Sequence, residues 1–187
     1  MKFIIETSAR HVHVDQNTLE ALFGKGYTLH PKKDLSQPGQ YASEEKVTVV
    51  GPKKEIAGVS ILGPVRNETQ VELSATDART IGVLPVIRES GDIIDTPSVI
   101  LRGPMGEVSL KEGVIVAKRH IHMTPKDAKE FNVKDKDIVQ VRAFSNGRSL
   151  IFDDVVIRVK DSFSLAMHID TDEANAAFGV CEGEIVR

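Results

Sequence analysis

Two short segments of the sequence repeat one arrangement of histidines. Arg-His-Val-His lies at residues 10–13 and Arg-His-Ile-His at residues 119–122, so four of the six histidines fall in these two copies. In an extended chain alternate side chains point the same way, and the two histidines of each copy therefore share a face. Neutral imidazoles at this spacing can bind Zn²⁺, Cu²⁺, Ni²⁺ or Fe²⁺. The repeat indicates a metal site.

Other residues bear on this site to different degrees. The candidate ligands are the two pairs and a fifth histidine, that is, His11, His13, His120, His122 and His168. One His-x-His alone is typical of a half-exposed strand, whereas two copies together with a further histidine favour metal binding. His30 lies in a polar stretch and is interpreted as a surface residue. From the residues alone, Glu72 is interpreted as a solvated strand residue, and Arg66 as a surface arginine whose planar fork would suit phosphate beside a metal.

Composition restricts the class of protein. The chain has 187 residues, 41% of them hydrophobic, and a net charge of −3, so no basic surface predicts binding to nucleic acid. No apolar run reaches the length of a membrane span, and the first residues do not form a signal-peptide pattern. Cys181 is the single cysteine, which excludes an intrachain disulfide and is interpreted as a packing residue. We therefore expect a cytoplasmic protein without a membrane partner.

Many short strands and few helices are expected to position the histidines. Aromatic residues make up only 5% of the chain, so Val, Ile and Leu must form the core, and these residues favour strands. Turn signals separate ten apolar segments that predict strands, at 3–6, 46–50, 58–62, 70–74, 98–102, 107–111, 113–117, 138–143, 150–159 and 165–169. Capping residues predict three short helices within 15–24, 124–133 and 170–179.

The two histidine copies have similar surroundings. Each follows a β-like segment and precedes a capped helix, which predicts two related small barrels that arose by duplication. The polar stretch 25–45 has no counterpart after the second copy, and we expect it to be an inserted loop or a small hairpin. The sequence lacks the glycine-rich dinucleotide and phosphate loops, the serine-hydrolase elbow and the His-Glu-x-x-His motif.

Several longer blocks resemble one enzyme family. Besides the histidine copies they are PKKDLSQPGQYA, ILGPVRNETQVELSATDAR, EGVIVAKRHIHMTPKDA and MHIDTDEANAA. In order, and along essentially the whole chain, the sequence resembles the PduL-type phosphate acyltransferases (phosphate propanoyltransferases). The resemblance implies a phosphotransacylase that interconverts a short-chain acyl-CoA, propionyl-CoA or acetyl-CoA, and inorganic phosphate with an acyl phosphate and CoA.

The resemblance also implies an architecture. It is a mainly β fold of two related β-barrels, each with about six strands and capped by short helices, with two zinc ions held between them. One barrel would span 10–117 and carry the insertion at about 24–45. The other would span 118–187 and be completed by the N-terminal strand 1–9. A homodimer is expected by the same resemblance. The N-terminal extension that directs many family members to a bacterial microcompartment is not expected here, which favours a free cytoplasmic enzyme or encapsulation by another route.

Position by position, the resemblance assigns roles to individual residues. The metal ligands of the family correspond to His11, His13, Glu72, His120, His122 and His168. The phosphate-contacting arginine of the family corresponds to Arg66. Residues of its CoA site correspond to Ser8, Lys33, Leu62 and Asn175. Ser60 departs from the family, which usually has arginine at this position, and a contact to the charged part of CoA is expected to be weaker or supplied elsewhere.

These residues predict a chemistry and leave two alternatives. A positively charged dimetal centre would orient phosphate and polarise the thioester, and Arg66 would hold the remaining phosphate oxygens. Without a convincing acyl-accepting nucleophile, we expect direct attack by phosphate. The alternatives are a dimetal hydrolase of thioesters or phosphoesters, and a metal-binding module without catalytic activity. Turnover that requires phosphate would separate the acyltransferase from the hydrolase. Metal binding without acyl-transfer activity would indicate the metal-binding module.

Overall fold

The structure is a computed structural model that describes residues 1–179 and 182–186, so Cys181 lies outside the described residues. The chain divides into two compact units. Unit 1 comprises residues 1–9, 36–38 and 118–187, and unit 2 comprises residues 10–35 and 39–117. Among the described helices, none has the length and apolar character needed to cross a membrane.

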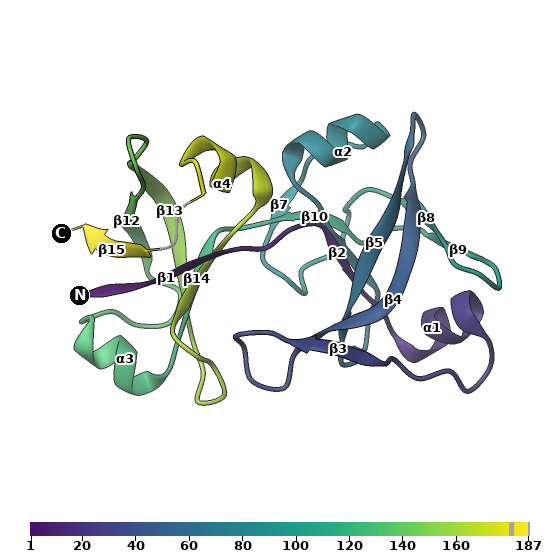
Figure 1. Cartoon of the computed structure of the whole chain (residues 1–187), viewed down its shortest axis with the longest axis horizontal. Coiled ribbons are helices and arrows are strands. Elements are labelled where there is room, and N and C mark those ends of the chain that lie inside the picture. The colour runs from purple at the N-terminus through teal and green to yellow at the C-terminus, as the bar shows by residue number, and fades with distance from the viewer. Residues whose placement is uncertain (180–181, 187) are drawn as a thin grey trace. The chain divides into compact units, whose positions relative to one another are not determined.

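Unit 1 is a closed barrel of six strands (Figure 1). In order around the barrel they are β1 (Lys2–Thr7), β14 (Ala166–Ile169), β11 (His120–Met123), β13 (Leu150–Val159), β12 (Ile138–Phe144) and β15 (Glu182–Val186). Strand β15 pairs with both β1 and β12, and this double pairing closes the barrel. The approach is tight at Gly183, where an added Cβ would lie 2.7 Å from the Cδ1 atom of Ile5.

Buried side chains and two capped helices complete unit 1. Its largest fully buried side chains are Ile121, Met123, Ile157, Met167 and Ile169. Helix α3 (Pro125–Glu130) and helix α4 (Thr171–Ala176) each begin with a capping box, in which the side chain before the helix and the third helical residue exchange hydrogen bonds.

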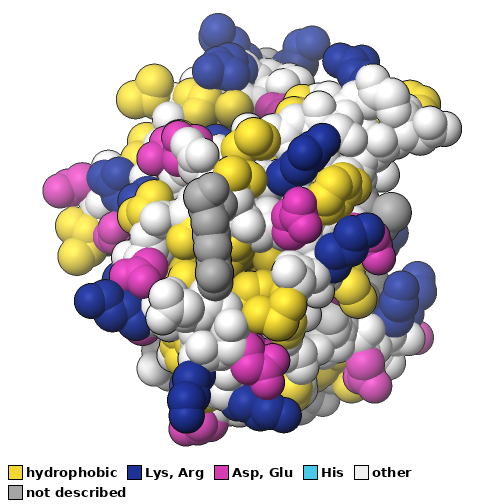
Figure 2. All heavy atoms as spheres, turned by 90° about the vertical axis from the view of Figure 1, so that its left-hand side faces the viewer, with side chains coloured by type: hydrophobic (Ala, Val, Ile, Leu, Met, Phe, Trp, Pro, Cys, Tyr) yellow, Lys and Arg dark blue, Asp and Glu magenta, His cyan; other side chains and the backbone are white. Residues whose placement is uncertain are grey.

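On the face drawn in Figure 2, hydrophobic side chains lie among basic and acidic ones, and no patch of a single charge sign dominates.

Unit 2 is a curled sheet of nine strands with two helices. Along the sheet the strands are β7 (Ile87–Arg88), β10 (Val114–Ala117), β6 (Gln70–Glu72), β2 (His11–His13), β5 (Glu55–Gly63), β4 (Tyr41–Val50), β8 (Val99–Arg102) and β9 (Glu107–Leu110), and β3 (Pro31–Asp34) forms a hairpin with β4. The helices are α1 (Gln16–Phe23) and α2 (Ala75–Ile81). Asp15 and Ser74 cap their N-termini.

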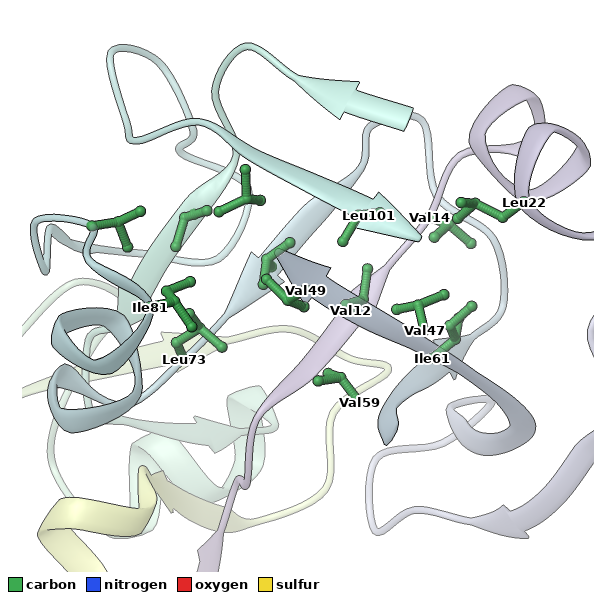
Figure 3. Close-up of a cluster of buried hydrophobic side chains, with 14 of the residues drawn as sticks. Val12, Val14, Leu22, Val47, Val49, Val59, Ile61, Leu73, Ile81 and Leu101 are labelled. Carbon is green, nitrogen blue, oxygen red and sulfur yellow. The ribbon is translucent and has the colours of Figure 1, made fainter. Parts of the chain in front are cut away.

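One hydrophobic cluster fills the interior of unit 2 (Figure 3). Strands and both helices contribute to it, and its labelled members are Val12, Val14, Leu22, Val47, Val49, Val59, Ile61, Leu73, Ile81 and Leu101. Val12 lies between the two histidines of β2 and is fully buried. The histidines of this strand therefore flank a core residue, and burial of that residue fixes which way they point.

Five strands have the same order and the same relative directions in both units. The order is β10-β6-β2-β5-β4 in unit 2 and β1-β14-β11-β13-β12 in unit 1. In each case the first pair is parallel, the second antiparallel, the third parallel and the fourth antiparallel. The strand with His-x-His is the central one in each set. This common arrangement supports the prediction of two related units.

The sequence predicted the mainly β class correctly, but two details differ. Unit 2 is an open nine-stranded sheet rather than a six-stranded barrel, because further strands occupy its outer edges: β7 pairs with β10, and β8 pairs with β4. Helix α2 was also not predicted. The strand predicted at 70–74 ends at Glu72 instead, because Ser74 accepts a hydrogen bond from the backbone N–H of Asp77 and starts a helix there.

Candidate active site

Unit 2 brings two histidines and one carboxylate together. His11 and His13 lie on β2 and Glu72 on β6, and the antiparallel register places His11 opposite Glu72. The Nε2 atom of His11 is 3.5 Å from Oε2 of Glu72, and that of His13 is 3.8 Å from Oε1. One candidate ligand atom from each residue lies within 4.8 Å of the others. We call these three residues the carboxylate triad.

Burial and charge set the protonation states of the carboxylate triad. Burial, with the nearby charges of His11 and Arg66, lowers the pKa of His13 to about 3. Burial alone would raise the pKa of Glu72, but the charges of His11 and His13 and hydrogen bonds from His11 and Ser90 outweigh it and hold that pKa well below its usual value. At neutral pH the triad thus offers a neutral imidazole and an ionised carboxylate. These are the forms that bind a divalent metal.

Polar neighbours hold the carboxylate of Glu72 in place. The Nε2 atom of Gln70 donates to Oε1 of Glu72 at 2.6 Å, and the Ser90 hydroxyl donates to the same oxygen at 2.9 Å. The backbone N–H of Gly91 donates to Oε1 of Gln70 at 2.7 Å and fixes the orientation of that amide. The interpretation of Glu72 as a solvated residue is therefore wrong, because the carboxylate lies buried beneath this network.

Arg66 connects the carboxylate triad to a pocket. Its Nη1 atom donates to the Ser90 hydroxyl at 3.2 Å, and Ser90 in turn contacts Glu72. The pocket has a volume of about 360 Å³ and is lined by Arg66, Asn67, Glu68, Gln70, Gly91 and Ile93. The backbone N–H of Arg66 donates to the carbonyl of Val14, just beyond β2, which anchors the arginine beside the histidine strand. An anion in this pocket would meet a guanidinium one hydroxyl away from the triad.

Unit 1 brings three histidines together. His120 and His122 lie on β11 and His168 on β14, and the antiparallel register places His120 opposite His168. The ring of His122 lies 4.6 Å from that of His120 and 4.9 Å from that of His168, measured between centroids. Candidate ligand atoms of the three residues lie within 4.8 Å of one another. We call these residues the histidine triad.

The histidine triad has the donor chemistry of a metal site. Burial, with the charges of His120 and His168, lowers the pKa of His122 to about 2, so its imidazole is neutral. Its Nδ1 atom is buried, and within the described part of the chain it has no hydrogen-bond partner. Nδ1 of His120 donates a hydrogen bond to the carbonyl oxygen of Lys118 at 2.8 Å, which leaves Nε2 with a lone pair. Three imidazoles with available lone pairs fit a zinc ion.

Two side chains flank His168. Oε2 of Glu6, on β1, is 3.7 Å from its Nδ1 atom. Nε2 of Gln37 is 3.5 Å from its Nε2 atom, and the amide of Gln37 is itself held by the backbone of Ser164, with contacts of 3.0 and 3.2 Å. Gln37 belongs to the 36–38 segment of unit 1 and is buried. The third ligand of this triad therefore lies between a carboxylate and a fixed amide.

The residues matched to a CoA site fall in both units. Ser8 and Asn175 belong to unit 1, where the backbone N–H of Ser8 donates to Ile169 and Asn175 lies exposed on α4. Lys33, exposed on β3, and half-buried Leu62 of β5 belong to unit 2. Their grouping around CoA stays a prediction.

Ser60 lies close to the carboxylate triad. It is on β5, and the parallel register places it opposite His11. The position at which the sequence departs from the resemblance is therefore adjacent to the strand that carries two candidate ligands.

Sequence reasoning missed the residues that surround the ligands. Gln70 had a signal, because it shares a strand face with Glu72 two residues later. Ser90 had none, since it reaches Glu72 from a loop eighteen positions away in the chain. Gln37 and Glu6 were missed for the same reason: they approach His168 from segments distant in the sequence.

Comparison with known proteins adds a family to this geometry. The family model described as phosphate propanoyltransferase matches residues 4–179. A protein of Thermotoga maritima named phosphate propanoyltransferase is 59% identical over 174 residues, which is 93% of this chain and 83% of the relative. Relatives with the same name from Clostridioides difficile and Leptotrichia buccalis are 55% and 60% identical, covering 98% and 93% of this chain and 87% and 82% of their own length.

Proposed function

Because the chain belongs to the phosphate propanoyltransferase family, we propose that it transfers a propionyl group between coenzyme A and inorganic phosphate. In this reaction a phosphate oxygen attacks the thioester carbonyl carbon, the carbon–sulfur bond breaks, and the products are acyl phosphate and CoA thiolate. Both substrates are anions, and further negative charge develops on the carbonyl oxygen during the attack. The enzyme must therefore supply fixed positive charge and orientation.

The link from Arg66 through Ser90 to Glu72 is the observation that carries this proposal. It puts a guanidinium fork in a pocket of about 360 Å³, one hydroxyl away from three buried candidate ligands. Arg66 would hold two phosphate oxygens and offset the charge of the tetrahedral intermediate. Its planar fork suits a tetrahedral oxyanion better than a point charge does.

Zinc is the metal we propose for both triads. His11, His13 and Glu72 would hold one ion, and His120, His122 and His168 would hold the other. When bound, zinc would supply Lewis-acid charge that lowers the repulsion between the anionic substrates and polarises the thioester carbonyl. The lowered pKa values of His13 and His122 support metal binding, because ligands that are already deprotonated release no proton at neutral pH.

We further propose that both triads serve one reaction and that phosphate attacks the thioester directly. The Ser90 hydroxyl contacts the carboxylate triad, but its proton is donated to Glu72 and its oxygen accepts from Arg66 and Gln70. A hydroxyl engaged in three hydrogen bonds is poorly placed to attack a thioester. Ping-pong kinetics, or an acylated enzyme trapped without phosphate, would contradict direct attack.

The first test is the rate of thioester loss from propionyl-CoA with and without phosphate, before and after chelation of metal. A rate that requires phosphate, yields acyl phosphate and disappears on chelation is expected. A chelator-sensitive rate that ignores phosphate would indicate a hydrolase instead. Metal binding without any rate would indicate a metal-binding module.

The finer parts of the proposal rest on the family. Propionyl-CoA and acetyl-CoA differ by one methylene, which is worth only about 1–3 kcal/mol even in a fitted pocket, so we expect both to react. Ser8, Lys33, Leu62 and Asn175 would contact CoA. A homodimer, a cytoplasmic location and an association with a bacterial microcompartment for propanediol degradation belong to the same proposal. Gel filtration tests the homodimer, and comparison of kcat/KM for the two thioesters tests the expectation that both react.

A further inference from the structure

The arginine of each Arg-His-x-His motif makes the same contact in its own unit. The Nε atom of Arg10 is 2.8 Å from Oδ2 of Asp77, and the Nε atom of Arg119 is 2.9 Å from Oε1 of Glu173. Asp77 lies five residues after Glu72, and Glu173 lies five residues after the corresponding ligand of unit 1. Each acid is the third residue of a short helix that begins directly after the strand of the third ligand.

These ion pairs join two segments that both carry ligands. Arg10 immediately precedes β2, and Arg119 immediately precedes β11, so each arginine starts the strand with two histidines. The acids sit on α2 and α4, where the backbone N–H groups of Asp77 and Glu173 donate to the capping side chains of Ser74 and Asp170. Each ion pair thus links the residue before the first ligand of its triad to the helix that follows the third ligand.

Stability alone does not explain why the contact recurs. The side chains of Arg10 and Arg119 are 44% and 31% exposed and those of Asp77 and Glu173 are 13% and 20% exposed, so solvent screens each ion pair from the arginine side and limits its contribution to folding. The strand ladders already hold the ligand strands together, with a matched register of His11 to Glu72 and of His120 to His168. What the ion pairs add is a restraint on the ends of these strands, beside the first ligand of each triad.

We propose that Arg10 and Arg119 are positioning residues that fix the first ligand of each triad relative to the third. The inference rests on the proposed metal sites and adds to them two residues that touch no metal. Outer contacts of this kind set the orientation of ligands, and their loss typically weakens metal binding by about 10- to 100-fold. Each arginine should act only on the triad of its own unit.

Metal affinity of the purified full-length protein tests the proposal. Zn²⁺ affinity is measured by competition with a chelator, and ligand geometry by the visible spectrum of the Co²⁺-loaded protein. We expect Arg119→Ala to weaken one of two Zn²⁺ sites by about 10- to 100-fold and to change the Co²⁺ spectrum. Exchanging the partners, as Arg119→Glu with Glu173→Arg, should restore most of the Zn²⁺ affinity and of the Co²⁺ spectrum. Arg119→Lys should restore part of the Zn²⁺ affinity. Arg10→Ala should affect the other site.

A matched control is available in unit 2. Arg102 forms exposed ion pairs with Glu55 and Glu107, away from the triads, and Arg102→Ala should leave both Zn²⁺ affinities and the Co²⁺ spectrum unchanged. Wild-type affinities and spectra in Arg10→Ala and Arg119→Ala, even with a lower melting temperature, would overturn the positioning role and leave the proposed function intact. A wild-type protein that binds neither Zn²⁺ nor Co²⁺ would overturn the metal sites and, with them, this inference.

Discussion

The two triads differ in one ligand on a common strand arrangement. Each places two histidines on a central strand and a third ligand on its antiparallel neighbour, but that ligand is Glu72 in unit 2 and His168 in unit 1. With a divalent ion the carboxylate triad would carry one positive charge less than the histidine triad. The arrangement of strands thus sets where ligands lie, while the third residue sets how much positive charge a substrate would meet.

The side chains around the third ligand also differ between the two triads. Glu72 accepts hydrogen bonds from Gln70 and Ser90, as an ionised carboxylate requires. His168 instead has a carboxylate, Glu6, near its Nδ1 atom, which suits an imidazole that donates there and binds metal with its other nitrogen. Exchanging Glu72 and His168 would leave each in surroundings built for the other. The divergence of the two halves therefore extends beyond the ligands themselves.

Removing a ligand from either triad is expected to have the largest effect. His120→Ala or His122→Ala should lose one metal ion and lower kcat by about a thousandfold or more, because Lewis-acid stabilisation is worth several kcal/mol. His11→Ala should have an effect of similar size if both triads serve one reaction. Metal content and initial rates measure both. His30→Ala is the matched control and should keep both metal ions and the wild-type rate. If the variant of one triad keeps the rate and the variant of the other loses it, only the second triad takes part in the chemistry.

Arg66→Ala should have the next largest effect. Metal should be retained at both sites, while kcat/KM for phosphate falls by about 10²- to 10³-fold, because the fork stabilises bound phosphate and the transition state. Varying phosphate at saturating propionyl-CoA separates KM from kcat. Wild-type rates at low phosphate would show that the pocket beside the carboxylate triad is not the phosphate site. Arg102→Ala should behave as the wild type in this assay.

Ser90→Ala should have a smaller effect, confined to the carboxylate triad. It removes a donor to Glu72 and the bridge to Arg66, so we expect a roughly tenfold loss of Zn²⁺ affinity or turnover, with the histidine triad unchanged. Chelator competition and initial rates measure these quantities. Complete loss of turnover with both metal ions retained, together with an acylated serine in the wild type, would point to a covalent mechanism instead.

A second histidine–carboxylate contact in unit 2 should affect stability alone. Burial opposes ionisation of Glu45, but hydrogen bonds from His30 outweigh it and lower the pKa of this carboxyl, whose Oε1 atom lies 2.7 Å from Nδ1 of His30. Its ionised form thus stabilises the fold above the unfolded pKa of about 4.3, and this contribution is lost as the pH falls through the lower folded pKa. Glu45→Gln should lower the free energy of unfolding at pH 7 by about 1–3 kcal/mol.

Denaturant unfolding at pH 7 and at pH 3 checks this prediction. The difference between the wild type and Glu45→Gln should narrow at the lower pH, and Zn²⁺ affinity should not change. A difference that stays constant with pH would mean that the carboxylate charge of Glu45 contributes nothing to stability. Loss of metal would mean that this contact, and not only Glu72, belongs to the metal centre.

The sequence revealed the histidine strands but not what surrounds them. A period of two residues places both histidines of a copy on one face, and burial of Val12 and Ile121 keeps them there. The same period made Glu72 look solvated, because the pairing of β6 with β2 is a long-range contact that no local pattern encodes. Ser90 and Gln37 were missed for that reason.

Local signals also failed where tertiary pairing decides. Three of the four described helices begin at the predicted caps, but α2 was overlooked because its Ser74 cap directly follows a strand. The number of strands in unit 2 depends on which further strands pair with its edges. Strands β7 and β8 do so through contacts between residues distant in the sequence. The repeat of histidines predicted small barrels, but the place of β1 in the barrel of unit 1 was accessible only through the family resemblance.

The position of β1 in unit 1 has a consequence for the order of folding during synthesis. Strand β1 pairs with β15, and the side chain of Lys2 donates to that of Glu182, the first residue of β15, across 180 positions of the chain. Nearly all residues of unit 2 have left the ribosome before β15 is made, so unit 2 can complete its core first. Phe3 and Ile5 of β1 are synthesised long before β15 and cannot be enclosed until that strand is made. Closure of the barrel is thus a late step with a large loop-closure entropy, and a slow one.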